Sequence, residues 1–98
     1  MIYIKIFNSN PKVVSICDAD LINKKFENEK MQIEINESFF KGELYDIKNA
    51  KKFIKNIMND YVTFNIVGKK SIKIAKELNL INNKNIVYIK DIPIALVL

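Results

Sequence analysis

Two segments of the chain place apolar residues at the three- and four-residue spacing of an amphipathic helix, and no other feature constrains the fold as strongly. The first segment opens at Asp46, and its apolar side comprises Ile47, Ala50, Phe53, Ile54, Ile57, Met58 and Tyr61. The second begins at Lys69 or Ser71 and ends near Asn79, and its apolar side comprises Ile74, Ala75, Leu78 and Ile81. Because each helix is apolar on one side only, both must pack against another layer of the fold.

Most of the remaining chain alternates apolar and polar residues with the two-residue period of a β-strand. The predicted strands cover residues 2–7, 12–17, 30–36, 62–67, 86–90 and 93–98. In the third of these, Met31, Ile33 and Ile35 point inward and the polar residues between them meet water, as in an antiparallel sheet. Residues 39–42 are predicted to form an irregular loop. We therefore expect a single α+β domain over residues 1–98, with a mostly antiparallel sheet of about five or six strands and both helices on one face.

The composition excludes several kinds of chemistry. The chain has no His and no Arg, so the usual zinc sites and the nucleophiles that depend on His are absent. The single cysteine, Cys17, ends an apolar run and is predicted to be a small buried hydrophobe rather than a reactive thiolate. The sequence thus favours a binding protein over an enzyme, and it predicts no cofactor and no metal.

Charge is divided unequally along the chain. Residues 1–46 hold six Lys against eight acidic residues, whereas residues 47–98 hold ten Lys against three. The basic half contains both predicted helices. Its excess of positive charge suggests an acidic or phosphate-bearing partner such as RNA or the ribosome. The lysines assigned to this surface are Lys48, Lys51, Lys52, Lys55, Lys69, Lys70, Lys73 and Lys76. A second interpretation, that these lysines are the ordinary solvent face of two helices, stays open.

Single-stranded RNA is also bound by aromatic platforms. The aromatic residues that could provide them are Tyr3, Phe7, Phe39, Phe40, Tyr45 and Tyr88. For most of these residues, a place in the core or as an anchor of a loop is the simpler interpretation.

Gly68 follows a predicted strand and precedes a predicted helix, as in a phosphate-binding Walker loop. That loop requires a glycine where Thr63 stands, so the Walker motif is incomplete. A weaker hypothesis is that the helix N-terminus binds an anion. Its residues would be Gly68, Lys69, Lys70 and Ser71. The alternative is a glycine turn beside two solvated lysines.

Two further motifs, a calcium-binding EF-hand loop and a helix-turn-helix, are incomplete in this sequence. Asp18 and Asp20 have the spacing of calcium ligands in an EF-hand, but Ile22 cannot bind calcium and Asn23 replaces the required glycine. Residues 75–81 resemble the first helix of a helix-turn-helix, but a strand is predicted where the recognition helix should follow.

A different functional hypothesis is a protein-interaction subunit or homodimer. The hydrophobic segment Pro93–Leu98 would pair with another chain if it lay at an edge of the sheet, whereas a central strand would be buried. No apolar stretch approaches the roughly 18 residues of a membrane span, and the alternating N-terminus does not resemble a signal peptide. We therefore expect a cytoplasmic protein with no membrane partner.

Four short segments occur in an order that resembles a known family. They are residues 21–24, 39–43, 65–68 and 93–95. Together they resemble an archaeal family of proteins of about 100 residues, designated a domain of unknown function, number four-two-four. The resemblance implies a small cytosolic α+β protein and assigns no activity. Family members favour Gly at the position of Asn23 and His at the position of Ile94, so any role of that histidine is absent here.

Overall fold

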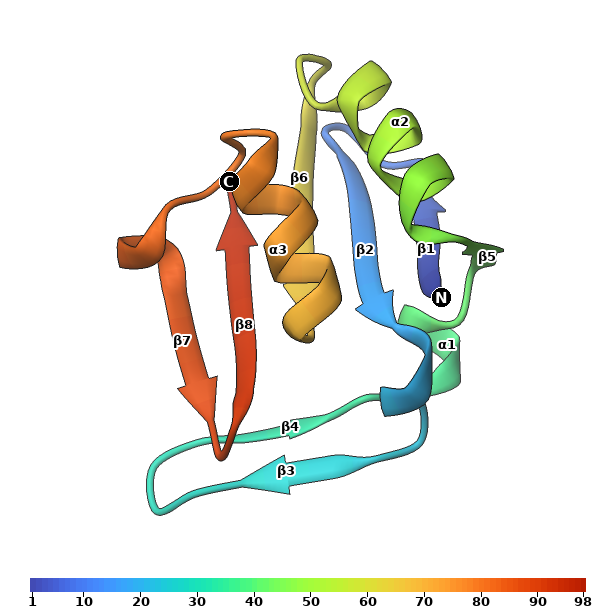
Figure 1. Ribbon diagram of the computed structural model, residues 1–98. Helices are drawn as coiled ribbons and strands as arrows, with labels where there is room; N and C mark the ends of the chain where they lie inside the picture. The colour runs from blue at the N-terminus through green and yellow to red at the C-terminus, as the bar shows by residue number, and fades with distance from the viewer.

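The computed structural model describes all 98 residues and contains a six-stranded sheet in the order β5-β1-β2-β6-β8-β7 (Figure 1). The strands are β1 (Ile2–Phe7), β2 (Lys12–Asp18), β5 (Glu43–Tyr45), β6 (Val62–Val67), β7 (Ile86–Ile89) and β8 (Ile92–Val97). Every neighbouring pair is antiparallel except β2 and β6, which run parallel in the middle of the sheet. The predicted α+β class and mostly antiparallel sheet are confirmed.

Two helices cover one face of the sheet, α2 (Ile47–Ile57) and α3 (Lys69–Glu77) (Figure 1). Asp46 caps α2, because its carboxylate accepts a hydrogen bond from the backbone N–H of Asn49 at 2.8 Å. The main core lies between these helices and the sheet. Its buried residues include Ile4, Ile16, Ile54, Phe64, Ile66 and Ile74. The prediction that α2 buries one apolar side is correct for the middle of the helix, where Ala50 and Ile54 are buried. It is wrong at the two ends, because Ile47 in the first turn is 41% exposed and Tyr61, beyond the end of the helix, is 73% exposed.

The opposite face of the sheet is covered by shorter elements. They are the one-turn helix α1 (Glu37–Phe40) and the separate hairpin of β3 (Lys25–Glu27) and β4 (Gln32–Glu34). A second cluster of buried residues lies on this side: Cys17, Leu21, Ile35, Phe40 and Val67. Because both faces are covered, five consecutive residues of β2 are buried, from Val14 to Asp18.

The structure corrects two local predictions and adds two short strands. The strand expected over residues 30–36 is shorter and pairs with β3 rather than joining the main sheet, and Met31 is 40% exposed. Residues 39–42 do not form one irregular loop, since α1 ends at Phe40 and β5 begins at Glu43. Both β3 and β5 contain only three residues, too few for a two-residue alternation to identify them.

The C-terminal strand lies inside the sheet. β8 pairs with β6 on one side and β7 on the other, and the edges are β5 and β7. Of the two positions considered for Pro93–Leu98, the internal strand is therefore correct and the exposed edge is wrong. A homodimer formed by pairing along this strand has no available edge.

Asn23 adopts a left-handed backbone conformation, with φ of 68°. Glycine takes this conformation without steric cost, and Asn is among the residues that tolerate it. The glycine expected here from the family resemblance is thus replaced by a residue that keeps the same turn.

Candidate nucleic-acid interface

The two rows of lysines lie on the same side of the sheet, because α2 and α3 are neighbouring helices on that face (Figure 1). The Nζ of Lys51 on α2 lies 3.4 Å from a carboxylate oxygen of Glu77 on α3, and this ion pair joins the two helices. Sequence periodicity places lysines on the outer side of each helix but cannot tell whether two helices share a face. The structure brings the two rows together.

The lysines of α3 border two grooves. A groove of about 420 Å³ lies between α3 and the β7–β8 hairpin, and its walls are Lys69, Ile72, Lys73, Lys76, Glu77, Tyr88 and Pro93. A smaller groove of about 310 Å³ is bordered by Ile47, Lys70, Lys73, Ile74 and Glu77. Among the α2 lysines, Lys52 borders a third depression with Tyr45, while Lys48 and Lys55 are exposed and border none of these grooves. The predicted lysines therefore share a side but are concentrated around α3.

Carboxylates neutralise few of these positive charges. Of the sixteen lysines, only Lys41 and Lys51 have a carboxylate oxygen within 4.0 Å of Nζ. The partner of Lys41 is Glu37, whose hydrogen bond raises the pKa of that ammonium group. The four lysines of α3 are exposed and have no ion-pair partner, so their charge faces the solvent.

The N-terminus of α3 already holds a negative group of the protein itself. The carboxylate of Asp18 accepts hydrogen bonds from the backbone N–H groups of Lys70 at 3.0 Å and Ser71 at 2.8 Å, and from the Ser71 hydroxyl at 2.7 Å. Asp18 is only 5% exposed. The predicted anion site at Gly68, Lys69, Lys70 and Ser71 is thus filled by Asp18, which occupies the N–H groups that a phosphate would need.

Gly68 makes this contact possible. Its φ of 109° is unfavourable for any residue with a Cβ, and a Cβ placed there would lie 2.3 Å from Cγ of Asp18. The glycine turn before the helix could be predicted from the sequence. The carboxylate beside it could not, because Asp18 lies 53 residues before Ser71 in the chain.

Among the candidate aromatic platforms, only Tyr88 lies in a lysine-lined groove and remains exposed, at 58%. The ring of Phe7 stacks on Phe39 at 5.1 Å between centroids, and Phe40 is buried. Tyr45 packs against Phe53 at 5.4 Å. These rings have partners within the protein, as the simpler interpretation of the sequence predicted for most of them.

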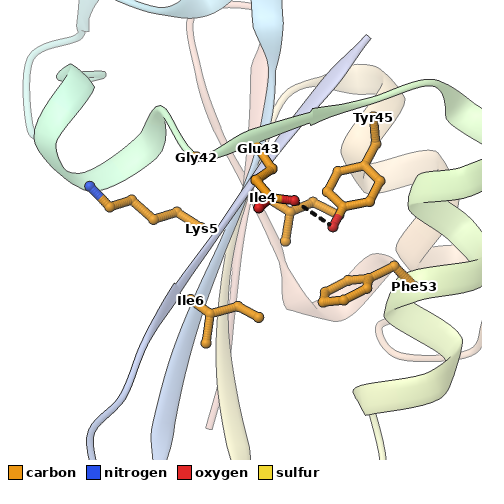
Figure 2. A pocket seen from close by; sticks show the side chains of 7 residues that line it. All are labelled: Ile4, Lys5, Ile6, Gly42, Glu43, Tyr45 and Phe53. Atoms are coloured by element: carbon orange, nitrogen blue, oxygen red, sulfur yellow. Dashed lines mark hydrogen bonds between the residues drawn. The ribbon is translucent and has the colours of Figure 1, made fainter.

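A second cavity of about 420 Å³ lies where β1 and β5 meet α2 (Figure 2). Its lining residues are Ile4, Lys5, Ile6, Gly42, Glu43, Tyr45 and Phe53. Figure 2 shows the rings of Tyr45 and Phe53 beside the cavity and the Lys5 side chain extending away from it. Glu43 is its one carboxylate and accepts a hydrogen bond from the Tyr45 hydroxyl at 3.4 Å. Burial, and secondarily the charge of Glu43, raises the pKa of Tyr45, so its hydroxyl stays protonated near neutral pH.

Cys17 does not provide a nucleophile. The residue is fully buried, and burial together with the charges of Asp18 and Asp20 raises the pKa of its thiol to about 12. The thiol donates a hydrogen bond to the backbone carbonyl of Asp18 at 3.2 Å. The prediction of a buried, unreactive cysteine is confirmed.

The fold has neither a metal-binding cluster nor a membrane-spanning helix. No group of three or more Cys, Asp or Glu side chains has an arrangement that would bind a metal ion. No helix has both the length and the apolar character needed to cross a bilayer.

Comparison with known proteins identifies a family and a structural relative. A comparison with curated proteins gives no match. A crystal structure of an uncharacterized conserved protein from Methanopyrus kandleri has the same fold, with a TM-score of 0.85 over 97% of this chain and 88% of the other, at 20% sequence identity. The profile of a family described as "Protein of unknown function (DUF424)" matches residues 7–98. The chain therefore belongs to the DUF424 family, as its four ordered segments indicated.

Proposed function

We propose that this protein binds RNA through the exposed lysines of α3, with the neighbouring lysines of α2 adding to the positive field. The observation that carries the proposal is that Lys69, Lys73 and Lys76 line one groove without a carboxylate partner. Their positions, four and three residues apart, place them along one side of the helix. A row of ammonium groups beside an open groove attracts a phosphate backbone without fixing a sequence.

The second half of the chain favours RNA over readout of duplex DNA. After α3 the chain forms a 3₁₀ turn (Asn83–Asn85) and then β7, so no recognition helix follows. The chain also lacks Arg, the residue that most often reads guanine in the major groove. A surface of lysines with an exposed aromatic ring beside it suits a single strand better.

Salt dependence of binding tests the electrostatic part of the proposal. The measurement is fluorescence anisotropy of a labelled single-stranded RNA of mixed sequence, titrated with the protein at several salt concentrations. If about four phosphates are neutralised, affinity should fall about 50-fold between about 50 and 200 mM salt. Affinity that does not change with salt, or no binding at low salt, would contradict the proposal.

Two triple variants with equal net charge locate the binding surface. Lys69→Glu, Lys73→Glu and Lys76→Glu together should weaken binding by at least about 20-fold at low salt. The matched control changes Lys24, Lys25 and Lys30 to Glu in and next to the β3–β4 hairpin, and all three are exposed. The control should lose less than about 3-fold, because its lysines lie away from the grooves around α3. Equal losses in the two variants would show that only net charge matters.

The lysines of α2 are expected to contribute less than those of α3. Changing Lys51 and Lys52 together to Glu should weaken RNA binding while the fold stays intact. Lys52 is exposed, and the half-exposed ion pair between Lys51 and Glu77 contributes less than about 1 kcal/mol to stability. We also propose that the protein acts in the cytoplasm of an archaeal cell, beside the ribosome, where RNA is abundant. The structural relative from Methanopyrus kandleri supports the archaeal setting.

A further inference from the structure

The groove between α3 and the β7–β8 hairpin combines a charged wall with an aromatic one. Lys69, Lys73 and Lys76 stand on the α3 side, and Tyr88 and Pro93 stand on the hairpin side. Tyr88 and Pro93 are direct partners across the two strands, so they form one continuous patch. In Figure 1, α3 lies in front of the middle of the sheet and β7 extends beyond it. Tyr88 lies on β7 and is exposed.

Tyr88 is 58% exposed, and its ring has no aromatic partner within the protein. The other strongly exposed tyrosine, Tyr61, lies in the turn before β6 and borders none of the grooves. Tyr88 is thus the aromatic side chain that a ligand of the lysine surface would meet.

We propose that this groove binds a single-stranded segment of RNA by stacking one unpaired base on Tyr88, while the α3 lysines hold the phosphates on either side of that base. This inference rests on the proposed RNA-binding function and adds the kind of RNA that is recognised. Every base has a π-face, so stacking tolerates any sequence, but it requires a base that is not already stacked in a duplex. The groove therefore predicts a preference for single strands over double strands.

Three single-residue variants test the stacking. Tyr88→Ala should weaken binding to a single-stranded RNA about 10-fold, because the platform is lost. Tyr88→Phe keeps the ring and should bind within about 2-fold of the wild type. Tyr61→Ala removes a tyrosine that is even more exposed but lies outside the grooves, and it should not change affinity. Circular dichroism of each variant verifies that the fold is kept.

A second comparison uses the wild-type protein with a single strand and a blunt duplex of the same length. We expect tighter binding to the single strand, and we expect Tyr88→Ala to remove most of that preference. If the wild type binds RNA but Tyr88→Ala binds it equally well, or if the duplex binds as tightly as the single strand, the stacking inference is wrong and the electrostatic proposal stands. If the wild type binds no RNA at low salt, both are wrong.

Discussion

Asp18 Oδ1 accepts two hydrogen bonds from Ser71, one from its backbone N–H at 2.8 Å and one from its hydroxyl at 2.7 Å. The contact joins the end of β2 to the first turn of α3. It places a buried negative charge at the positive end of the helix, beneath a surface that carries Lys69 and Lys70. The same carboxylate thus stabilises the helix that presents the lysines and excludes an external anion from its N-terminus.

Removing this carboxylate should destabilise the fold. We expect Asp18→Ala to lower the free energy of unfolding by about 3 kcal/mol, because three hydrogen bonds to a charged acceptor are lost and their donors stay buried. Asp18→Asn keeps an acceptor oxygen and should cost about 1 to 2 kcal/mol. Urea unfolding followed by circular dichroism measures both. The control is Asp20→Ala, an exposed carboxylate two residues away, which should stay within about 0.5 kcal/mol of the wild type.

Gly68→Ala should strongly lower the stability of the fold, although it adds only a methyl group. The new Cβ would meet the Asp18 carboxylate, and the φ of 109° would become strained. We expect a loss of more than about 2 kcal/mol in the free energy of unfolding. Lys69→Ala, at the next position on the helix, should leave the stability nearly unchanged. Similar stabilities for these two variants would show that the close contact is not needed.

Cys17 should resist alkylation in the folded protein. Because its thiol is buried and has its pKa raised to about 12, iodoacetamide at about pH 8 should modify it only when the chain unfolds. The raised pKa also has a consequence for stability. The neutral thiol stabilises the fold fully below its unfolded pKa of 9.0, and this contribution is lost as the pH rises toward 12. Mass spectrometry with and without urea measures the alkylation, and rapid modification without urea would contradict the burial.

Removing the charge of Glu77 should strengthen RNA binding, whereas removing the charges of the lysines should weaken it. Its carboxylate pairs with Lys51 and borders both grooves of α3, so it lowers the positive potential there. Glu77→Gln should tighten RNA binding about 2- to 3-fold at low salt. The stability should change by less than about 1 kcal/mol, because each side chain of the pair is 44% exposed. Weaker binding by this variant would indicate that the carboxylate itself contacts the RNA.

The strands and helices whose apolar pattern is long enough could be predicted from the sequence. They are β1, β2, β6, α2 and α3, together with the shorter β7 and the apolar β8. β3 and β5 escaped prediction because three residues carry no measurable period. The internal position of β8 was likewise not determined, since an apolar strand at the end of a chain fits both an edge and a centre.

The candidate site was predicted less completely than the fold, for a geometrical reason. Helical spacing identified the lysines on α2 and α3, but the groove also needs Tyr88 and Pro93, which belong to a hairpin later in the chain. Tyr88 was one of six candidate aromatic residues, and only packing separates it from rings such as Phe40. The role of Asp18 at α3 depends on a contact between residues more than fifty positions apart.

The most direct test of the account is an NMR titration of the ¹⁵N-labelled protein with a single-stranded RNA at low salt. The account predicts that the largest amide shifts fall in Lys69–Glu77 and Ile86–Ile89, the two elements that face each other across the lysine groove. Shifts concentrated in the β3–β4 hairpin, or around the cavity lined by Ile6 and Phe53, would contradict it. A spectrum that does not change on addition of RNA would contradict it as well.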